Sequence, residues 1–141
     1  MRYLAIDLGD KRTGLAVGDD ASGVVSPAGV VVCGAPHERR RQILRAVRDH
    51  GPDALVVGLP LNMDGTAGPA AGRCRDEARR LADASGLTVH LVDERATSQE
   101  ADAQMARRGL THGQKKARRD ALAAANILRR FLGLAEGPGA P

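Results

Sequence analysis

Carboxylates stand at the ends of two short apolar runs in the sequence. Asp7 follows the run Tyr3–Ile6, and Glu94 comes just after the run Leu87–Val92, with Asp93 between them. Ligand sites in parallel α/β sheets lie at the carboxyl ends of strands, so these acids are candidates for one shared site. A single acid at a strand end more often caps a loop or a helix. Asp93 fits that role and ranks below Glu94, although spacing alone does not separate the two.

A third acid, Asp120, lies on an apolar face of the last predicted helix. Three core-forming residues share that face at i+4, i+7 and i+11: Ala124, Ile127 and Phe131. Because burial of a lone carboxylate is costly, Asp120 must be solvated in a cleft, paired with a base or bound to a metal ion. Arg12 and Arg119 are the candidate bases.

Three acids that meet at one edge of a sheet repel one another unless a cation lies between them. Hard oxygen ligands without a histidine cluster favour Mg²⁺ or Mn²⁺. Two such ions ~4 Å apart can activate a water molecule and stabilise the leaving oxygen in phosphodiester hydrolysis. We therefore predict that two ions bind at the catalytic residues Asp7, Glu94 and Asp120.

Basic residues near these acids are candidates for contacts with phosphate groups. Lys11 and Arg12 stand at the tip of a predicted hairpin, and Arg95 follows Glu94 directly. A basic cluster at residues 115–119 opens the last helix, where cations oppose the helix dipole and a compensating anion would be favourable. The alternative for such a cluster is an ordinary solvated face.

The loop at residues 58–68 leads into a helix N-terminus, where free N–H groups attract anions. It lacks the GKS/T signature of a P-loop. The loop is either an ordinary connection, with Thr66 or Asp64 as the helix cap, or part of the substrate site. The candidate substrate-binding residues are Lys11, Arg12, Asn62, Asp64, Gly65, Arg95, Lys115, Lys116 and Arg119.

Composition limits the classes of function. Aromatic residues make up only 1% of the 141 residues, which disfavours a platform that stacks splayed-out bases. The net charge of +4 favours nucleic acid as a partner, or merely reflects a GC-rich genome. The two cysteines are isolated, which disfavours a zinc site or a disulfide framework. No apolar run resembles a signal peptide or a membrane span, so we expect a cytoplasmic protein without membrane contact.

The pattern of apolar residues predicts one α/β domain over residues 1–135 with a flexible tail at 136–141. The expected strands are Tyr3–Leu8, Thr13–Val17, Gly23–Cys33, Ala54–Leu59 and Leu87–Val92, of which the last two are expected to be buried. The expected helices are His37–His50, Pro69–Ser85, Thr97–Gly109 and Thr111–Leu134. The acidic residues of the second helix are expected to face water. We predict a mixed five-stranded sheet, with the first three strands antiparallel and the last two parallel, flanked by helices. Pro27 suggests a sheet edge or a bulge.

Four colinear segments between residues 5 and 132 resemble the YqgF-type family, also called the RuvX family: AIDLGDKRTGLAVGD, VVGLPLNMDGTAG, VDERATSQEA and KKARRDALAAANILRRFL. These small bacterial proteins are described as pre-16S rRNA nucleases or as Holliday-junction-resolvase-like. The resemblance implies a ribonuclease H-like fold, a divalent-metal site and action on structured nucleic acid in ribosomal RNA maturation. It places the family's three acids at Asp7, Glu94 and Asp120. Arg119 departs from the pattern, because the residue before the third acid is commonly apolar in the family.

Other functions stay open from the sequence. A Holliday junction resolvase would use the same chemistry on branched DNA and would need a symmetric dimer. A non-catalytic RNA-binding factor for ribosome assembly or transcription fits the charge but has no need of three acids. A sugar kinase or actin-like ATPase fits the turn after Asp7, but such proteins need two domains of this kind. RNA is favoured over DNA as the substrate. The sequence does not decide between endo- and exonucleolytic cleavage, between Mg²⁺ and Mn²⁺, or between a monomer and a homodimer.

Overall fold

A five-stranded mixed sheet forms the centre of the structure, a computed structural model that describes residues 1–62, 64–94 and 112–134, with the backbone alone over 112–119. The strands are β1 (Arg2–Asp7), β2 (Arg12–Asp19), β3 (Val25–Val32), β4 (Ala54–Leu59) and β5 (Thr88–Asp93). Their order in the sheet is β3-β2-β1-β4-β5. The first three strands are antiparallel, and β4 lies parallel to β1 and to β5. The predicted mixed sheet is confirmed.

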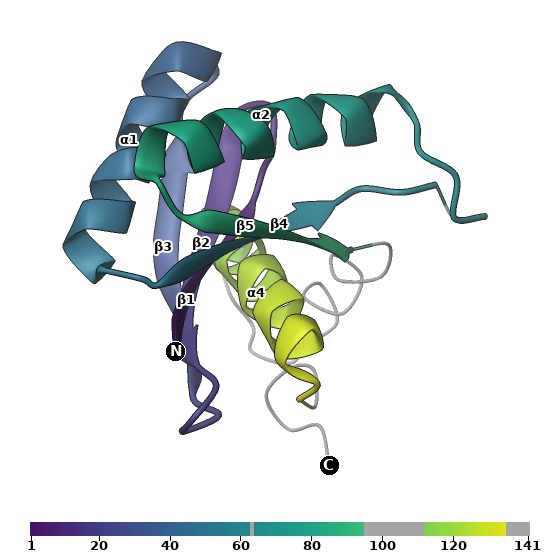
Figure 1. Cartoon of the computed structure of the whole chain (residues 1–141). Coiled ribbons are helices and arrows are strands. Elements are labelled where there is room, and N and C mark those ends of the chain that lie inside the picture. The colour runs from purple at the N-terminus through teal and green to yellow at the C-terminus, as the bar shows by residue number, and fades with distance from the viewer. Residues whose placement is uncertain (63, 95–111, 135–141) are drawn as a thin grey trace.

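Helices cover both faces of this sheet (Figure 1). Helices α1 (Pro36–His50) and α2 (Pro69–Ser85) lie on one face, and α4 (His112–Leu132) crosses the other. Side chains alternate between the faces along each strand. Leu4 and Ile6 of β1 therefore pack with α1 and α2, whereas Tyr3 and Ala5 pack against α4. The next residue on the α4 face of β1 is Asp7.

Glycines allow α4 to lie unusually close to the sheet. A Cβ atom on Gly14 of β2 would overlap the backbone carbonyl of Asp120. A Cβ atom on Gly58 of β4 would lie 2.5 Å from the Ile127 side chain and 2.5 Å from a carboxyl oxygen of Glu94. The helix presents small residues to the sheet in return, since Ala121 and residues 123–125, all alanine, are buried. Backbone contact of this kind fixes where the first described side chain of α4, that of Asp120, enters the fold.

The two edge strands differ from the central ones. Pro27 lies in the edge strand β3. The register between β3 and β2 shifts next to this proline, so the predictions of a sheet edge and of a bulge are both confirmed. The strand β5 was expected to be buried, and this expectation is wrong. Among the strands that the structure describes, β5 pairs with β4 alone, and its residues are partly or fully exposed.

Two expectations for helix α2 are wrong. Neither Thr66 nor Asp64 caps the helix, because its N-cap is Gly68 and no described side chain makes a capping hydrogen bond. Not all its acids face water, since Glu77 is buried, bonded to Arg40 of α1. The helix expected at residues 97–109 and the tail at 136–141 lie outside the described residues.

Candidate functional site

The carboxyl groups of Asp7 and Glu94 meet at one edge of the sheet. Strands β1, β4 and β5 are parallel, so their carboxyl ends point the same way. Just beyond β5, the backbone N–H of Glu94 donates to the carbonyl of Leu59 at the end of β4 (3.2 Å). Two acids separated by 87 positions in sequence are thereby brought side by side, as the strand-end pattern predicted.

The electrostatics of Glu94 reflect this contact. Burial raises the pKa of its carboxyl group to about 10, and the charge of Asp7 and a hydrogen bond with Asp7 act in the same direction. Asp93 adds to the rise, whereas Arg130 opposes it. Arg130 also donates a hydrogen bond to the backbone carbonyl of Asp93, so α4 holds the end of β5. One proton or one cation is needed to keep the two acids together.

Asp120 reaches the same end of the sheet from α4 but is bonded to a base. Gly14, which lies under the Asp120 backbone, is the β2 partner of Asp7. The Asp120 carboxylate accepts a hydrogen bond from Nε of Arg12 at 2.6 Å, and its side chain is 15% exposed. Of the alternatives for this acid, pairing with Arg12 is the one the structure shows.

The residues present fit a divalent cation in the chemistry of their donors. Asp7 and Glu94 supply hard carboxylate oxygens in contact, and Gly58 leaves the space that the Glu94 carboxyl group occupies. Among the described residues, no group of three acidic, histidine or cysteine side chains stands close enough together to hold an ion. Two of the three predicted ligands are thus brought together, and the third is engaged by Arg12.

The predicted substrate-binding residues have different surroundings. Lys11 is exposed in the turn between β1 and β2. The exposed residues Asn62, Asp64 and Gly65 build a turn, in which Asn62 and Asp64 each bond to the Thr66 hydroxyl. Lys115, Lys116 and Arg119 belong to the first turns of α4, of which only the backbone is described, and Arg95 lies outside the described residues.

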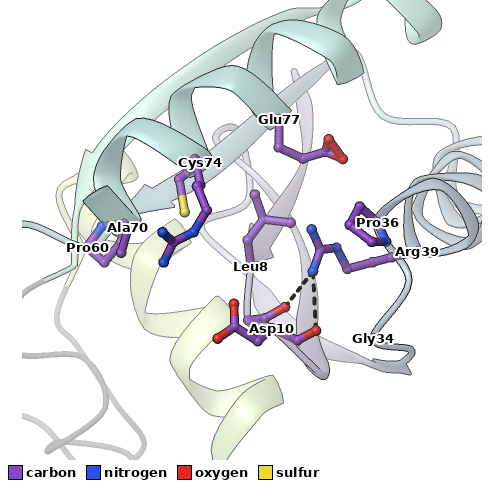
Figure 2. A pocket seen from close by; sticks show the side chains of 11 residues that line it. Leu8, Asp10, Gly34, Pro36, Arg39, Pro60, Ala70, Cys74 and Glu77 are labelled. Atoms are coloured by element: carbon purple, nitrogen blue, oxygen red, sulfur yellow. Dashed lines mark hydrogen bonds between the residues drawn. The ribbon is translucent and has the colours of Figure 1, made fainter. Parts of the chain in front are cut away.

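Sequence reasoning missed a pocket of about 490 Å³ between α1 and α2, shown in Figure 2. Arg39 crosses it and donates to the backbone carbonyls of Gly9 (2.9 Å) and Asp10 (3.4 Å). Burial raises the pKa of the Cys74 thiol in its wall to about 11, and the nearby charges of Glu94 and Asp7 add to this rise. The pocket therefore adjoins the acid pair. No local pattern in the sequence signals it, because Arg39 lies 30 positions from Gly9.

The sequence profile of RuvX, described as "Holliday junction resolvase", matches residues 1–133. The chain belongs to the RuvX family. One RuvX relative, from Anaeromyxobacter sp. (strain K), is named "Putative pre-16S rRNA nuclease" and is 43% identical over 132 residues, covering 94% of this chain and 96% of that relative. A relative of the same name from Opitutus terrae is 43% identical over 133 residues, covering 94% and 91% of the two chains.

Solved structures share the fold of this RuvX chain. Thermus thermophilus RuvC in complex with a Holliday junction substrate aligns with a TM-score of 0.53 and 17% identity, over 96% of this chain and 98% of that one. The fowlpox virus resolvase in complex with junction DNA aligns with a TM-score of 0.57 and 11% identity, over 94% and 99%. The predicted ribonuclease H-like fold is confirmed. Within the described residues, no helix has the length and apolar character that crossing a membrane requires.

Proposed function

We propose that this protein is a divalent-metal-dependent nuclease that hydrolyses phosphodiester bonds in structured nucleic acid. The observation that carries the proposal is the contact between the carboxyl groups of Asp7 and Glu94. Burial raises the pKa of Glu94 to about 10, and the contact with Asp7 adds to this rise. Contact between two ionised acids opposes folding. Such a pair is typical of a site that receives a cation or transfers a proton.

The side chains around the acid pair have distinct roles in this proposal. Asp7 and Glu94 would hold Mg²⁺ or Mn²⁺, with Asp120 as the third, more distant acid. A divalent cation bound there would neutralise charge on the phosphoryl oxygens and make a water molecule a better nucleophile. Asp120 orients the Arg12 guanidinium, which is partly exposed beside the acids, toward a phosphate of the substrate. Lys11, exposed in the adjacent turn, contributes a second cation to the same backbone.

The substrate we propose is the precursor of 16S ribosomal RNA. Support comes from the name shared by the relatives at 43% identity, which cover nearly the whole of both chains. Such a substrate would place the protein in the cytoplasm. Branched DNA is the second candidate, since the family profile is described as that of a Holliday junction resolvase. Both substrates present the same phosphodiester to the acids, so the chemistry is common to the two.

Cleavage assays with Asp7→Asn test the proposal. We expect the wild-type protein to cut pre-16S rRNA with Mn²⁺ and not with EDTA, and the variant to lose about a thousandfold in rate, because several kcal/mol of charge stabilisation is lost. RNA binding and the melting temperature should stay near wild type. Asp49→Asn, which makes the same change at an exposed position of α1, is the matched control and should cut normally.

Three results would contradict the proposal in different ways. Undiminished cleavage by Asp7→Asn would show that the acid pair takes no part in cleavage. Cleavage of a four-way DNA junction, with pre-16S rRNA left intact, would assign the resolvase activity instead. Salt-dependent RNA binding without any product in Mg²⁺ or Mn²⁺ would leave a non-catalytic binding factor.

A further inference from the structure

The pocket between α1 and α2 is continuous with the segments that carry the acids. Its floor includes Leu8, Gly9 and Asp10, which follow Asp7 directly. Pro60, another lining residue, follows Leu59, whose carbonyl accepts the backbone N–H of Glu94. A polymer that crosses the acid pair would therefore reach the pocket within a short distance.

The walls of the pocket combine apolar surface with cations. Figure 2 shows Pro60 and Ala70 on one side, Pro36 and Arg39 on the other, and Leu8 between them. The remaining cation of the lining, Arg73, belongs to the exposed surface of α2. The volume of about 490 Å³ falls in the range of about 300–1,000 Å³ typical of small-molecule sites.

The charges of the lining favour an anionic group. The acid Glu77 is compensated, because Arg40 donates to both of its oxygens, at 3.0 Å and 2.8 Å. The carboxylate of Asp10 is exposed. Arg39 is held by two backbone carbonyls, and its buried Nε makes no hydrogen bond to any described residue. A guanidinium held in this way places a fixed positive charge in the pocket wall. The first turn of α2 adds the backbone N–H of Ala70, because Pro69 has none.

We propose that this pocket receives one unpaired nucleotide of the nucleic-acid chain beside the bond that is cut. The apolar walls would take the base, and Arg39, Arg73 and the start of α2 would take its phosphate. The inference rests on the proposed nuclease function and names a feature of its substrate. Enzymes that receive a single nucleotide out of a stack commonly hold the base between apolar side chains. A partly open pocket with apolar walls would thus replace the aromatic platform that this sequence lacks.

Binding in the absence of metal tests the pocket independently of cleavage. Titration of the protein in EDTA with AMP, CMP, GMP and UMP, followed by two-dimensional ¹H–¹⁵N NMR, should shift the amides of residues 8–10 and 70–74 saturably. A parallel titration with inorganic phosphate separates a nucleotide site from a simple anion site. Fluorescence anisotropy with a labelled single-stranded RNA gives a second measure of affinity.

Two variants alter the pocket without touching the acids. Ala70→Leu fills it from an exposed position in the first turn of α2, and Arg73→Ala removes a cation. Each should weaken nucleotide binding about tenfold, the value of one charge-assisted hydrogen bond or of a blocked contact. Arg75→Ala is the matched control, because this exposed arginine of the same helix faces a different hollow beside Leu91 of β5. It should bind like wild type.

Each outcome decides a separate question. Wild-type affinity in both Ala70→Leu and Arg73→Ala, or phosphate binding as tight as nucleotide binding, would overturn the nucleotide pocket. A protein that cuts pre-16S rRNA but binds no nucleotide in EDTA would also overturn it and leave the nuclease function intact. Saturable nucleotide binding by a protein that never cuts would support the pocket and contradict the nuclease function.

Discussion

The two faces of the sheet surround a partly or fully buried carboxylate with opposite charges. On the face of α1 and α2, the Glu77 side chain is 5% exposed and accepts hydrogen bonds from Nε and Nη2 of Arg40. On the α4 face, burial and a second acid, Asp7, raise the pKa of Glu94, and Arg130 only partly offsets this rise. The first face neutralises its acid with an arginine in direct contact. On the second face the raised pKa of Glu94 favours binding of a proton or a cation.

This difference separates structure from function within one small domain. The Arg40–Glu77 pair joins α1 to α2 and has no opening for an additional ion, since the carboxylate is already satisfied. The Asp7–Glu94 pair is unfavourable while both acids are ionised and becomes favourable when a proton or a cation binds. Variants that exchange or remove these acids are therefore the sharpest tests of the contrast.

The largest effect is expected from Glu94→Gln compared with Glu77→Gln. Glu94→Gln should lower the rate of metal-dependent cleavage about a thousandfold, because charge stabilisation worth several kcal/mol is lost. Its stability in EDTA at neutral pH should equal or exceed that of wild type, since a carboxyl group with a raised pKa is removed. Glu77→Gln should keep its activity and lose about 2 kcal/mol in the free energy of unfolding, because Arg40 loses its charged partner. Equal behaviour of the two variants in both assays would abolish the distinction between the faces.

A smaller effect should follow from adding one methyl group at Gly14 or at Gly72. Gly14→Ala forces α4 away from the sheet and should cost about 3 kcal/mol in the free energy of unfolding, with a loss of cleavage as Asp120 is displaced. Gly72→Ala, in α2, meets no atom within 4 Å and should stabilise the protein by about 0.5–1 kcal/mol through helix propensity. Thermal and urea denaturation measure both. Normal stability and activity of Gly14→Ala would show that the close approach of α4 is not required.

The last effect is a slope in stability with pH. The pKa of Glu94 rises from an ordinary 4.5 to about 10 on folding, so the folded protein binds the proton more tightly. The resulting stability is fully present below about pH 4.5 and is lost progressively as the pH rises toward 10. Urea denaturation in EDTA between pH 5 and 8.5 should therefore show a decline that Glu94→Gln flattens and Asp49→Asn does not. Mn²⁺ should reverse the decline, because ion binding displaces the proton. Parallel slopes for wild type and Glu94→Gln would contradict the raised pKa.

Local patterns in the sequence were enough to predict most of the fold and the contact between two of the three candidate acids, Asp7 and Glu94. Asp7 and Glu94 each end an apolar strand, and parallel strands bring such ends together whatever fills the core between them. The partner of Asp120 could not be chosen from sequence, since Arg12 lies 108 positions away and Arg119 is its neighbour. The burial of Glu77 was missed for the same reason: helical periodicity shows which face a residue occupies, not which distant arginine meets it.

The contact between Gly14 and the Asp120 backbone joins one main chain to another. The height of α4 above the sheet at that point is consequently independent of which side chains fill the interior. Hydrophobic residues elsewhere in this core can then be exchanged without moving the turn of α4 that carries Asp120. Selection at this edge of the sheet must then act on the glycines as strictly as on the carboxylates, because a residue with no side chain sets where the helix rests.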